Sequence, residues 1–171
     1  MASKHLSERT KQPGHDRSFV ASEQAFFSVV RDILGDEFEV TDHPMTLSRL
    51  HNRSPAEPRK GIIPEVGITH RRTGKQVFFE VKKQGPRGNA EERAAKHHTR
   101  QFYTRMNELL GFEYHPFVTI MCESLATDER YTRKFPDFYE PGQYFLWADY
   151  NIDSLEQFLL EMVRRFELDK E

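Results

Sequence analysis

The chain has 171 residues and a formal net charge of −2 at pH 7, a size that suits a single domain with one hydrophobic core. No apolar run is long enough for a membrane span, and residues 1–18 lack the apolar segment of a secretory signal, so we expect a cytoplasmic protein. The single cysteine, Cys122, excludes an intramolecular disulfide and stands in an apolar run, where we expect it to pack in the core.

The weakly acidic total does not favour a DNA-binding protein, but the charge is unevenly distributed. From Lys82 to Arg105, seven basic residues stand against two acidic ones, an excess of five positive charges. Binding to phosphates requires a local basic patch rather than a basic total. The composition therefore leaves nucleic acid open as a partner.

The first half of the chain predicts a disordered tail, a helix, and then strands. Residues 1–18 are polar and are expected to be disordered, and Ser22 is a candidate cap for a helix whose apolar stripe ends at Gly35. Phe38 and Val40 indicate a short strand. Residues 43–60 contain prolines and many charges, which favours a loop or an insertion.

The second half predicts a hairpin followed by alternating helices and strands. Residues 62–69 and 76–83 are expected to be strands joined by a turn at 71–74, with a break at 85–89. Helical character over 90–110, strands over 116–123 and 143–148, and a last helix capped by Asp153 or Ser154 complete the order. This order predicts one α/β domain over residues 19–171, with a mixed central β-sheet flanked by helices.

The hairpin carries a constellation of charged residues. Side chains alternate faces along a strand, so Glu80 and Lys82 project the same way, and Glu65 on the partner strand can face them. Two carboxylates and an ammonium can hold Mg²⁺ and position a water for phosphodiester hydrolysis. The alternative is a solvated hairpin face with an ordinary Glu–Lys pair. Phe79 and Val81 make the strand largely apolar, which favours the site because unneeded charge there is costly.

Two motifs bear a resemblance to a known family. Pro64-Glu65 followed by Glu80-Val81-Lys82 resembles the PD…(D/E)xK signature of type II restriction endonucleases, and Gly88-Asn89-Ala90-Glu91-Glu92-Arg93 is similar to the more specific G-N-A-x-E-R segment of the EcoRI/MunI-type enzymes. The likeness extends over roughly residues 20 to 168. It implies a restriction-endonuclease-like core and a homodimer that cuts palindromic double-stranded DNA with Mg²⁺, or with Mn²⁺ as a substitute. A cognate DNA methyltransferase is a further partner that the family suggests.

The resemblance also assigns roles to individual residues. Glu65, Glu80 and Lys82 match the catalytic residues, and the metal ligands would be Glu65, Glu80 and the backbone carbonyl of Val81. The residues that would contact DNA are Arg87, Gly88, Asn89, Ala90, Arg93 and Lys96. Within that set, Asn89, Ala90 and Arg93 match residues that read an inner AATT, and Arg87 matches an arginine that reads an outer C·G pair, which favours CAATTG. Glu92 would orient the recognition groups, and Glu23 matches an acidic residue of the first helix near the site.

The chemistry of these side chains agrees with the assignment. Asparagine can pair bidentately with adenine, arginine with guanine, and a small apolar group can touch the thymine methyl. The alternatives are ordinary turn chemistry for Arg87 and Asn89 and a solvated helix face for Arg93 and Lys96.

One position departs from the family pattern. Glu65 stands where the family has aspartate, and its extra methylene would shift a bound metal, so we expect activity to be weakened, moved toward Mn²⁺, or lost. Three alternatives stay open beside the restriction enzyme. They are a sequence-specific DNA-binding protein with a disabled metal site, a structure-selective repair nuclease with the same core, and a globular protein whose motifs arose by chance.

Overall fold

The computed structural model of the protein describes residues 17–48, 62–84 and 88–171. Of the predicted tail, residues 1–16 lie outside the described ranges. The same holds for residues 49–60 of the predicted loop and for residues 85–87 of the predicted break, which include Arg87. Within the described ranges, no helix is both long and apolar enough to span a membrane.

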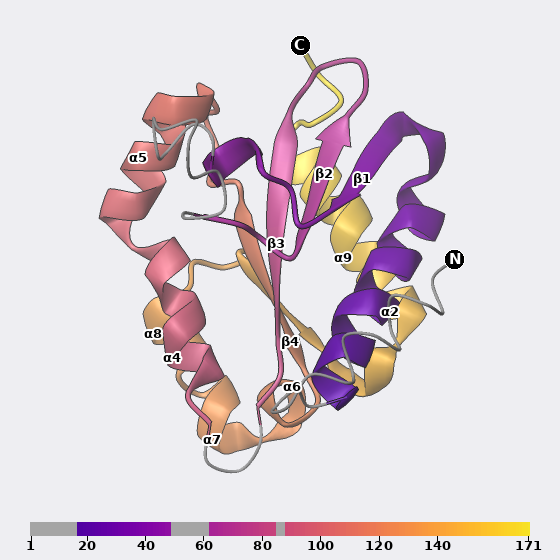
Figure 1. Ribbon diagram of the computed structural model, residues 1–171. Coiled ribbons are helices and arrows are strands. Elements are labelled where there is room, and N and C mark those ends of the chain that lie inside the picture. The colour runs from indigo at the N-terminus through magenta and orange to yellow at the C-terminus, as the bar shows by residue number, and fades with distance from the viewer. Residues whose placement is uncertain (1–16, 49–61, 85–87) are drawn as a thin grey trace.

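A five-stranded mixed sheet forms the centre of the molecule (Figure 1). Its strands lie in the order β1 (Phe38–Asp42), β2 (Val66–His70), β3 (Gln76–Lys82), β4 (Phe117–Cys122) and β5 (Tyr144–Trp147). The first three strands pair antiparallel, and β3, β4 and β5 pair parallel. The predicted α/β class with a mixed sheet is thus confirmed.

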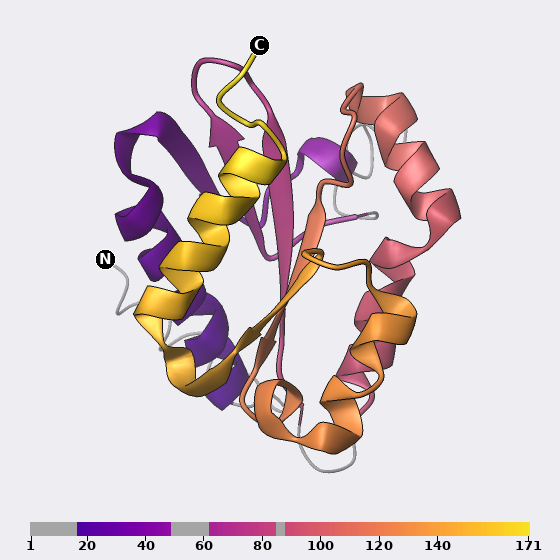
Figure 2. The ribbon, with the colours of Figure 1, turned by 180° about the vertical axis from the view of Figure 1, so that it is seen from behind.

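Helices cover both faces of this sheet. On one side lie α2 (Arg17–Leu34) and α9 (Ile152–Arg165), which run next to each other in Figure 2. On the other side lie α4 (Ala90–Ala94) and α5 (Arg100–Leu110), together with the short helices α6 (Ser124–Thr127), α7 (Glu129–Thr132) and α8 (Phe135–Phe138). The 3₁₀ turns η1 (Gly35–Glu37), η2 (Ala95–His98) and η3 (Ala148–Tyr150) complete the elements described by the structure.

Strand β3 divides its side chains between two cores. Val77, Phe79 and Val81 pack in the core beneath α2 and α9, whereas Phe78 packs with Phe117 beneath α5. Because side chains alternate along the strand, Glu80 and Lys82 continue the Phe78 face and point toward α4 and η2. The sheet therefore presents its charged residues to the side on which the G-N-A segment begins a helix.

The turn of the β2–β3 hairpin is held by the C-terminal segment. Thr73 Oγ1 donates a hydrogen bond of 2.6 Å to the carbonyl of Leu168, and Lys75 Nζ donates one of 2.8 Å to the carbonyl of Glu167. The two segments lie side by side at one end of the molecule in both views (Figures 1 and 2). These contacts fix the hairpin that carries the candidate site.

Several predicted boundaries are wrong at the N-terminal side. The first helix begins at Arg17 rather than at Ser22, and the Ser22 hydroxyl is 2.6 Å from the Tyr150 hydroxyl instead of capping the helix. Residues 46–48 are helical, although the prediction placed them in a loop. Strand β2 begins at Val66, so residues 62–64 precede it and Glu65 lies at the bend that leads into the strand.

Two predicted helices also differ in detail. The predicted helix over 90–110 is interrupted at Thr99, whose side chain accepts a hydrogen bond from the backbone of Phe102 and caps α5. The last helix is capped by Asn151, not by Asp153 or Ser154. The core assignment of Cys122 is correct, since its side chain is fully buried.

Phe26 provides a test of the core beneath α2. Its ring is fully buried and packs edge-on against Phe79 and Trp147, with centroid distances of 5.1 and 6.0 Å. We expect Phe26→Ala to lower the free energy of unfolding by about 3–5 kcal/mol, because a large cavity opens beside β3. Urea denaturation measures the change. Phe138→Ala, at a ring that is 41% exposed, is the matched control, and an equal loss in both variants would contradict the assignment of the core.

Candidate active site

The hairpin register brings Glu65 beside Glu80. Val66 pairs with Phe79 across β2 and β3, and the Glu65 N–H donates to the carbonyl of Phe79 at 3.2 Å. Glu65 therefore enters the sheet next to the strand position of Glu80, as expected for two strands joined by a tight turn. The local sequence thus determines this pairing.

The three charged side chains predicted from the motif meet at one point. Lys82 Nζ lies 2.7 Å from Glu65 Oε1 and 2.8 Å from Glu80 Oε2. The other oxygen of Glu65 accepts a hydrogen bond from the backbone N–H of Val81. The extra methylene of glutamate therefore lets Glu65 reach both the ammonium and the backbone of β3.

Burial shapes the ionisation of this cluster. The Glu65 and Glu80 side chains are only 11% and 8% exposed. Burial and the adjacent Glu80 carboxylate raise the pKa of Glu65 well above its usual value. Burial opposes ionisation of Glu80 too, but Lys82 and His97 outweigh it and the pKa of Glu80 is lowered. Burial lowers the pKa of Lys82, but the two carboxylates outweigh it and raise that pKa, so Lys82 is a cation here and not a base.

The donor set suits a hard divalent cation. Two carboxylates share one ammonium, and burial together with the neighbouring Glu80 carboxylate raises the pKa of Glu65, so a cation placed beside it would favour its ionised form. Among the residues that the structure describes, no group of three or more His, Cys, Asp or Glu side chains could hold a metal. Two carboxylates are nevertheless sufficient for Mg²⁺, which binds through one or two carboxylates and keeps water or phosphate oxygens. The residues present therefore fit Mg²⁺ or Mn²⁺.

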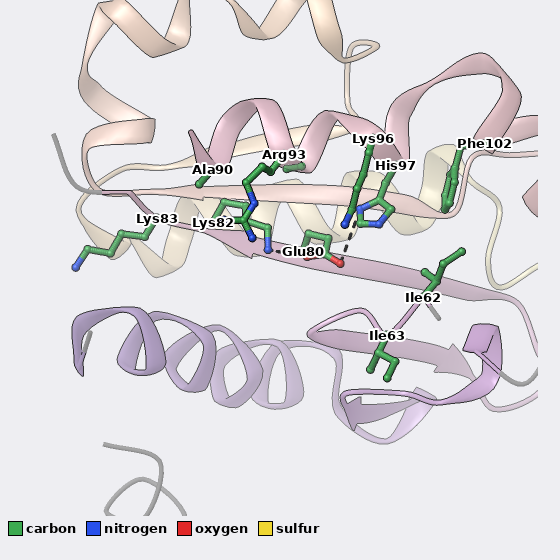
Figure 3. Close-up of a pocket in the computed structure, with 11 residues that line it drawn as sticks. Ile62, Ile63, Glu80, Lys82, Lys83, Ala90, Arg93, Lys96, His97 and Phe102 are labelled. Atoms are coloured by element: carbon green, nitrogen blue, oxygen red, sulfur yellow. Dashed lines mark ion pairs between the residues drawn. The ribbon is translucent and has the colours of Figure 1, made fainter. Parts of the chain in front are cut away.

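A cavity of about 630 Å³ opens above the charged cluster (Figure 3). Its cationic lining residues are Lys82, Lys83, Arg93 and Lys96, and its acidic lining residue is Glu80. Arg93 and Lys96 point from the helical segment toward β3 in Figure 3, facing Lys82 and Glu80. Cationic walls around a buried acidic cluster favour a polyanion over a neutral ligand.

The predicted recognition segment lies at the edge of the same cavity. Gly88 and Asn89 are exposed, and Asn89 precedes α4 without capping it through its side chain. A Cβ on Gly88 would lie 2.8 Å from the Cβ of Gln84, so the close approach requires glycine. Gln84 Oε1 accepts a hydrogen bond of 2.7 Å from the Ala90 N–H. Asn89 is therefore exposed next to the first residue of α4, whose backbone is held in place by Gln84.

The other predicted DNA-contacting residues are also accessible. Arg93 and Lys96 are exposed, and neither forms an ion pair with a described residue. This weighs against the alternative in which they pair with Glu91 and Glu92, because Glu91 is buried 3.7 Å from Lys134 and Glu92 is exposed. Within the described ranges, neither Glu92 nor Lys96 forms an ion pair with the cluster of Glu65, Glu80 and Lys82.

Glu23 is placed less directly than the other candidates. It is buried on α2, which packs against β3 from the side that carries Val81. Its accessory role stays a prediction.

A polar chain at the end of β3 was not predicted. Lys83 Nζ lies 2.7 Å from Glu123 Oε2, and the Tyr150 hydroxyl donates to Glu123 Oε1 at 2.9 Å and contacts Ser22. Glu123 adopts a positive φ of 52° immediately after β4. Lys83, adjacent to Lys82, was the available signal, but the other members of the chain come from α2, the residue after β4 and η3, which no local pattern connects.

One buried histidine, His97, and two half-buried ones, His98 and His115, lie between the sheet and α5. The ring of His97 stacks on Phe117 at a centroid distance of 4.9 Å, and the ring of His115 lies 5.2 Å from that of Tyr103. His98 Nε2 is 2.9 Å from Thr119 Oγ1. Burial lowers the pKa of His97 to about 4 and that of His115 to about 4, so both rings are neutral at pH 7.

Comparisons with known proteins agree with the motifs. A family model described as type II restriction enzyme MunI matches residues 1–167. A crystal structure of MunI restriction endonuclease in complex with cognate DNA is similar in fold, with a TM-score of 0.65, 19% identity and 94% coverage of each chain. None of the curated proteins matches the chain.

The lowered pKa of the half-buried His115 predicts acid-sensitive stability. An unfolded chain takes up a proton on His115 below pH about 6.5, whereas the folded protein resists protonation down to about pH 4. The free energy of unfolding should therefore fall as the pH drops from 6.5 to 4. His115→Phe should reduce this fall by about 1–2 kcal/mol, measured by urea denaturation at each pH. Parallel curves for the wild type and the variant would contradict the prediction.

Proposed function

We propose a target sequence for this chain, which belongs to the MunI family of type II restriction enzymes and is therefore a site-specific deoxyribonuclease. The proposed substrate is palindromic double-stranded DNA with an AATT core, and the preferred site is CAATTG. The observation that carries the proposal is the Lys82 ammonium between two buried carboxylates, beside a cavity that Ala90 and Arg93 of the predicted recognition segment line. One such site cuts one strand, so we propose a homodimer for a palindrome. The proposal extends to a cytoplasmic location and a cognate DNA methyltransferase.

Glu65, Glu80 and the backbone carbonyl of Val81 are the proposed ligands of Mg²⁺, with Mn²⁺ as a substitute. When bound, the ion stabilises charge on the phosphate and lowers the pKa of a bound water. Lys82, a cation in this arrangement, holds the phosphate or the attacking water by hydrogen bonding. The reach of Glu65 to the Val81 N–H supports glutamate in the place of the family's aspartate, so we propose that activity is retained.

The segment that begins α4 is the proposed reader of the bases. Asn89, Ala90 and Arg93 would read AATT in the major groove, and Arg87, outside the described residues, would read the outer C·G pair. Gly88 permits the close turn, Lys96 would contact a phosphate, and Glu92 and Glu23 are proposed accessory residues. The exposure of Asn89 and Arg93 and the cap that Gln84 gives to the helix support this assignment.

Digestion of a plasmid with one CAATTG and one GAATTC site tests the function. With Mg²⁺ or Mn²⁺, we expect cleavage at CAATTG, because Arg87 provides a bidentate donor for the outer guanine. Cleavage only at GAATTC would overturn the role of Arg87. Cleavage of branched or nicked DNA without regard to AATT would favour a repair nuclease, and tight site binding without any cleavage or metal binding would favour a DNA-binding protein.

Lys82→Ala separates binding from chemistry in the same assay. We expect the variant to bind the CAATTG duplex and to lose cleavage by at least about 100-fold, since its ammonium is the group that the two carboxylates position. Lys170→Ala, at an exposed ion pair with Glu167, is the matched control and should cut normally. A Lys82→Ala protein that cuts at the wild-type rate would remove Lys82 from the mechanism.

Asn89→Ala tests base readout. The variant should bind CAATTG and unrelated DNA with equal affinity, because the loss of a bidentate contact to adenine costs about 1–3 kcal/mol in each subunit. Fluorescence anisotropy with Ca²⁺ in place of Mg²⁺ measures both affinities. Full discrimination by the variant would show that the adenine is read elsewhere.

A further inference from the structure

His97 is a feature of the cavity that neither motif explains. Its side chain is 8% exposed, lines the cavity, and places Nδ1 3.9 Å from Oε1 of Glu80. This Nδ1 is buried and has no hydrogen-bond partner among the residues that the structure describes. Figure 3 shows the ring next to the Glu80 carboxylate, joined to it by a dashed line. A buried, unpaired nitrogen is thus directed at a residue of the acidic cluster.

Packing alone does not account for a histidine here. The ring stacks on Phe117 at 4.9 Å and lies 5.2 Å from the ring of Phe102. A phenylalanine or leucine would fill this apolar site without a nitrogen that lacks a partner, and burial of an unsatisfied polar atom costs free energy. The group that Nδ1 faces, the Glu80 carboxylate, provides a reason for the imidazole.

We propose that His97 is a positioning residue, whose Nδ1–H donates a hydrogen bond to Oε1 of Glu80 and fixes the orientation of that carboxylate toward the metal. The inference rests on the proposed function, which assigns Glu80 to the metal. A small rotation of the carboxylate that shortens the separation by about 1 Å gives an ordinary N–H···O distance. Any form of the ring with hydrogen on Nδ1 can donate, so the contact requires no change of protonation.

The position of His97 links Glu80 to the segment that is proposed to read bases. His97 lies on η2, which continues directly from α4 and its Arg93. The next residue, His98, contacts Thr119 at 2.9 Å, and Thr119 pairs with Glu80 across β3 and β4. The helical segment is therefore anchored on both sides of Glu80, by His97 at its side chain and by His98 at its strand neighbour.

Binding of Mn²⁺ to the full-length protein tests the inference without relying on cleavage. Electron paramagnetic resonance of free Mn²⁺ measures the dissociation constant for the wild type, His97→Phe and His97→Asn. Phenylalanine keeps the stacking and removes the donor, whereas the asparagine amide nitrogen can occupy the place of Nδ1. We expect His97→Phe to weaken Mn²⁺ binding by about 10- to 100-fold, as is usual when a partner of a metal ligand is lost, and His97→Asn to stay within about threefold of the wild type.

Each remaining outcome decides against the inference in a distinct way. Equal affinities in the three proteins, or an equal loss in both variants, would overturn the donor role while the proposed nuclease function stands. A wild type that neither binds Mn²⁺ nor cuts CAATTG would overturn the proposed function itself, and this inference with it. Thermal unfolding checks that the variants fold, and His97→Leu replaces His97→Phe if the larger ring is not tolerated, with the same expected weakening.

Discussion

The ion cluster on β3 depends on the cost of placing charge in a buried strand. Lys82 lies between the carboxylates of Glu65 and Glu80, on a strand whose other residues pack into apolar cores on both faces. An unpaired carboxylate there would be strongly destabilising, so the three groups are stable only together. Two carboxylates face one ammonium, and a divalent cation bound there would offset the burial and repulsion that raise the pKa of Glu65. The ion pairs that lower the cost of burying these charges are thus also the groups that the proposed function uses to bind a metal and a phosphate.

The parallel half of the sheet then determines where the recognition segment lies. Strand β4 runs parallel to β3, and the connection between them returns along one face of the sheet as α4, η2 and α5. This crossover lies on the Glu80 face, so Ala90 and Arg93 line the same cavity as Glu80 and Lys82. Under the proposed function, the base-reading residues and all of the catalytic residues except Glu65 come from one continuous stretch of chain, Gln76 to His98.

Local patterns were sufficient to predict the hairpin and its charges. A tight turn determines the register of β2 against β3, and the alternation of side chains along a strand places Glu80 and Lys82 on one face. The position of Glu65 beside Glu80 therefore follows from the spacing of these residues in the sequence. The position of Asn89 near that face did not follow from spacing. It depends on the packing of α4 over β3, and only the likeness to the restriction enzymes indicated it.

The errors arise where a local pattern allows more than one outcome, and for Ser22 and His97 the outcome depends on contacts between distant segments. Ser22 favours a helix cap by its local chemistry, but its hydroxyl contacts Tyr150, which is far away in sequence. The helical pattern of residues 90–110 continues through Thr99, although Thr99 caps a new helix there. His97 gave no signal, because the His97-His98 pair in a helical segment belongs to no periodic pattern and only the folded sheet places His97 beside Glu80.

The short connection between Lys82 and Asn89 has a consequence for how specificity can evolve. Residues 83–88 span the distance between chemistry and readout, and within them Gln84 bonds the first residue of α4 through its side chain and accepts the Ser124 hydroxyl at its carbonyl. A lengthened connection would break these bonds and separate Asn89, the proposed base reader, from the proposed catalytic residues on β3. Under the proposed function, substitutions in α4 would change the target sequence, whereas insertions in residues 83–88 would separate base recognition from cleavage.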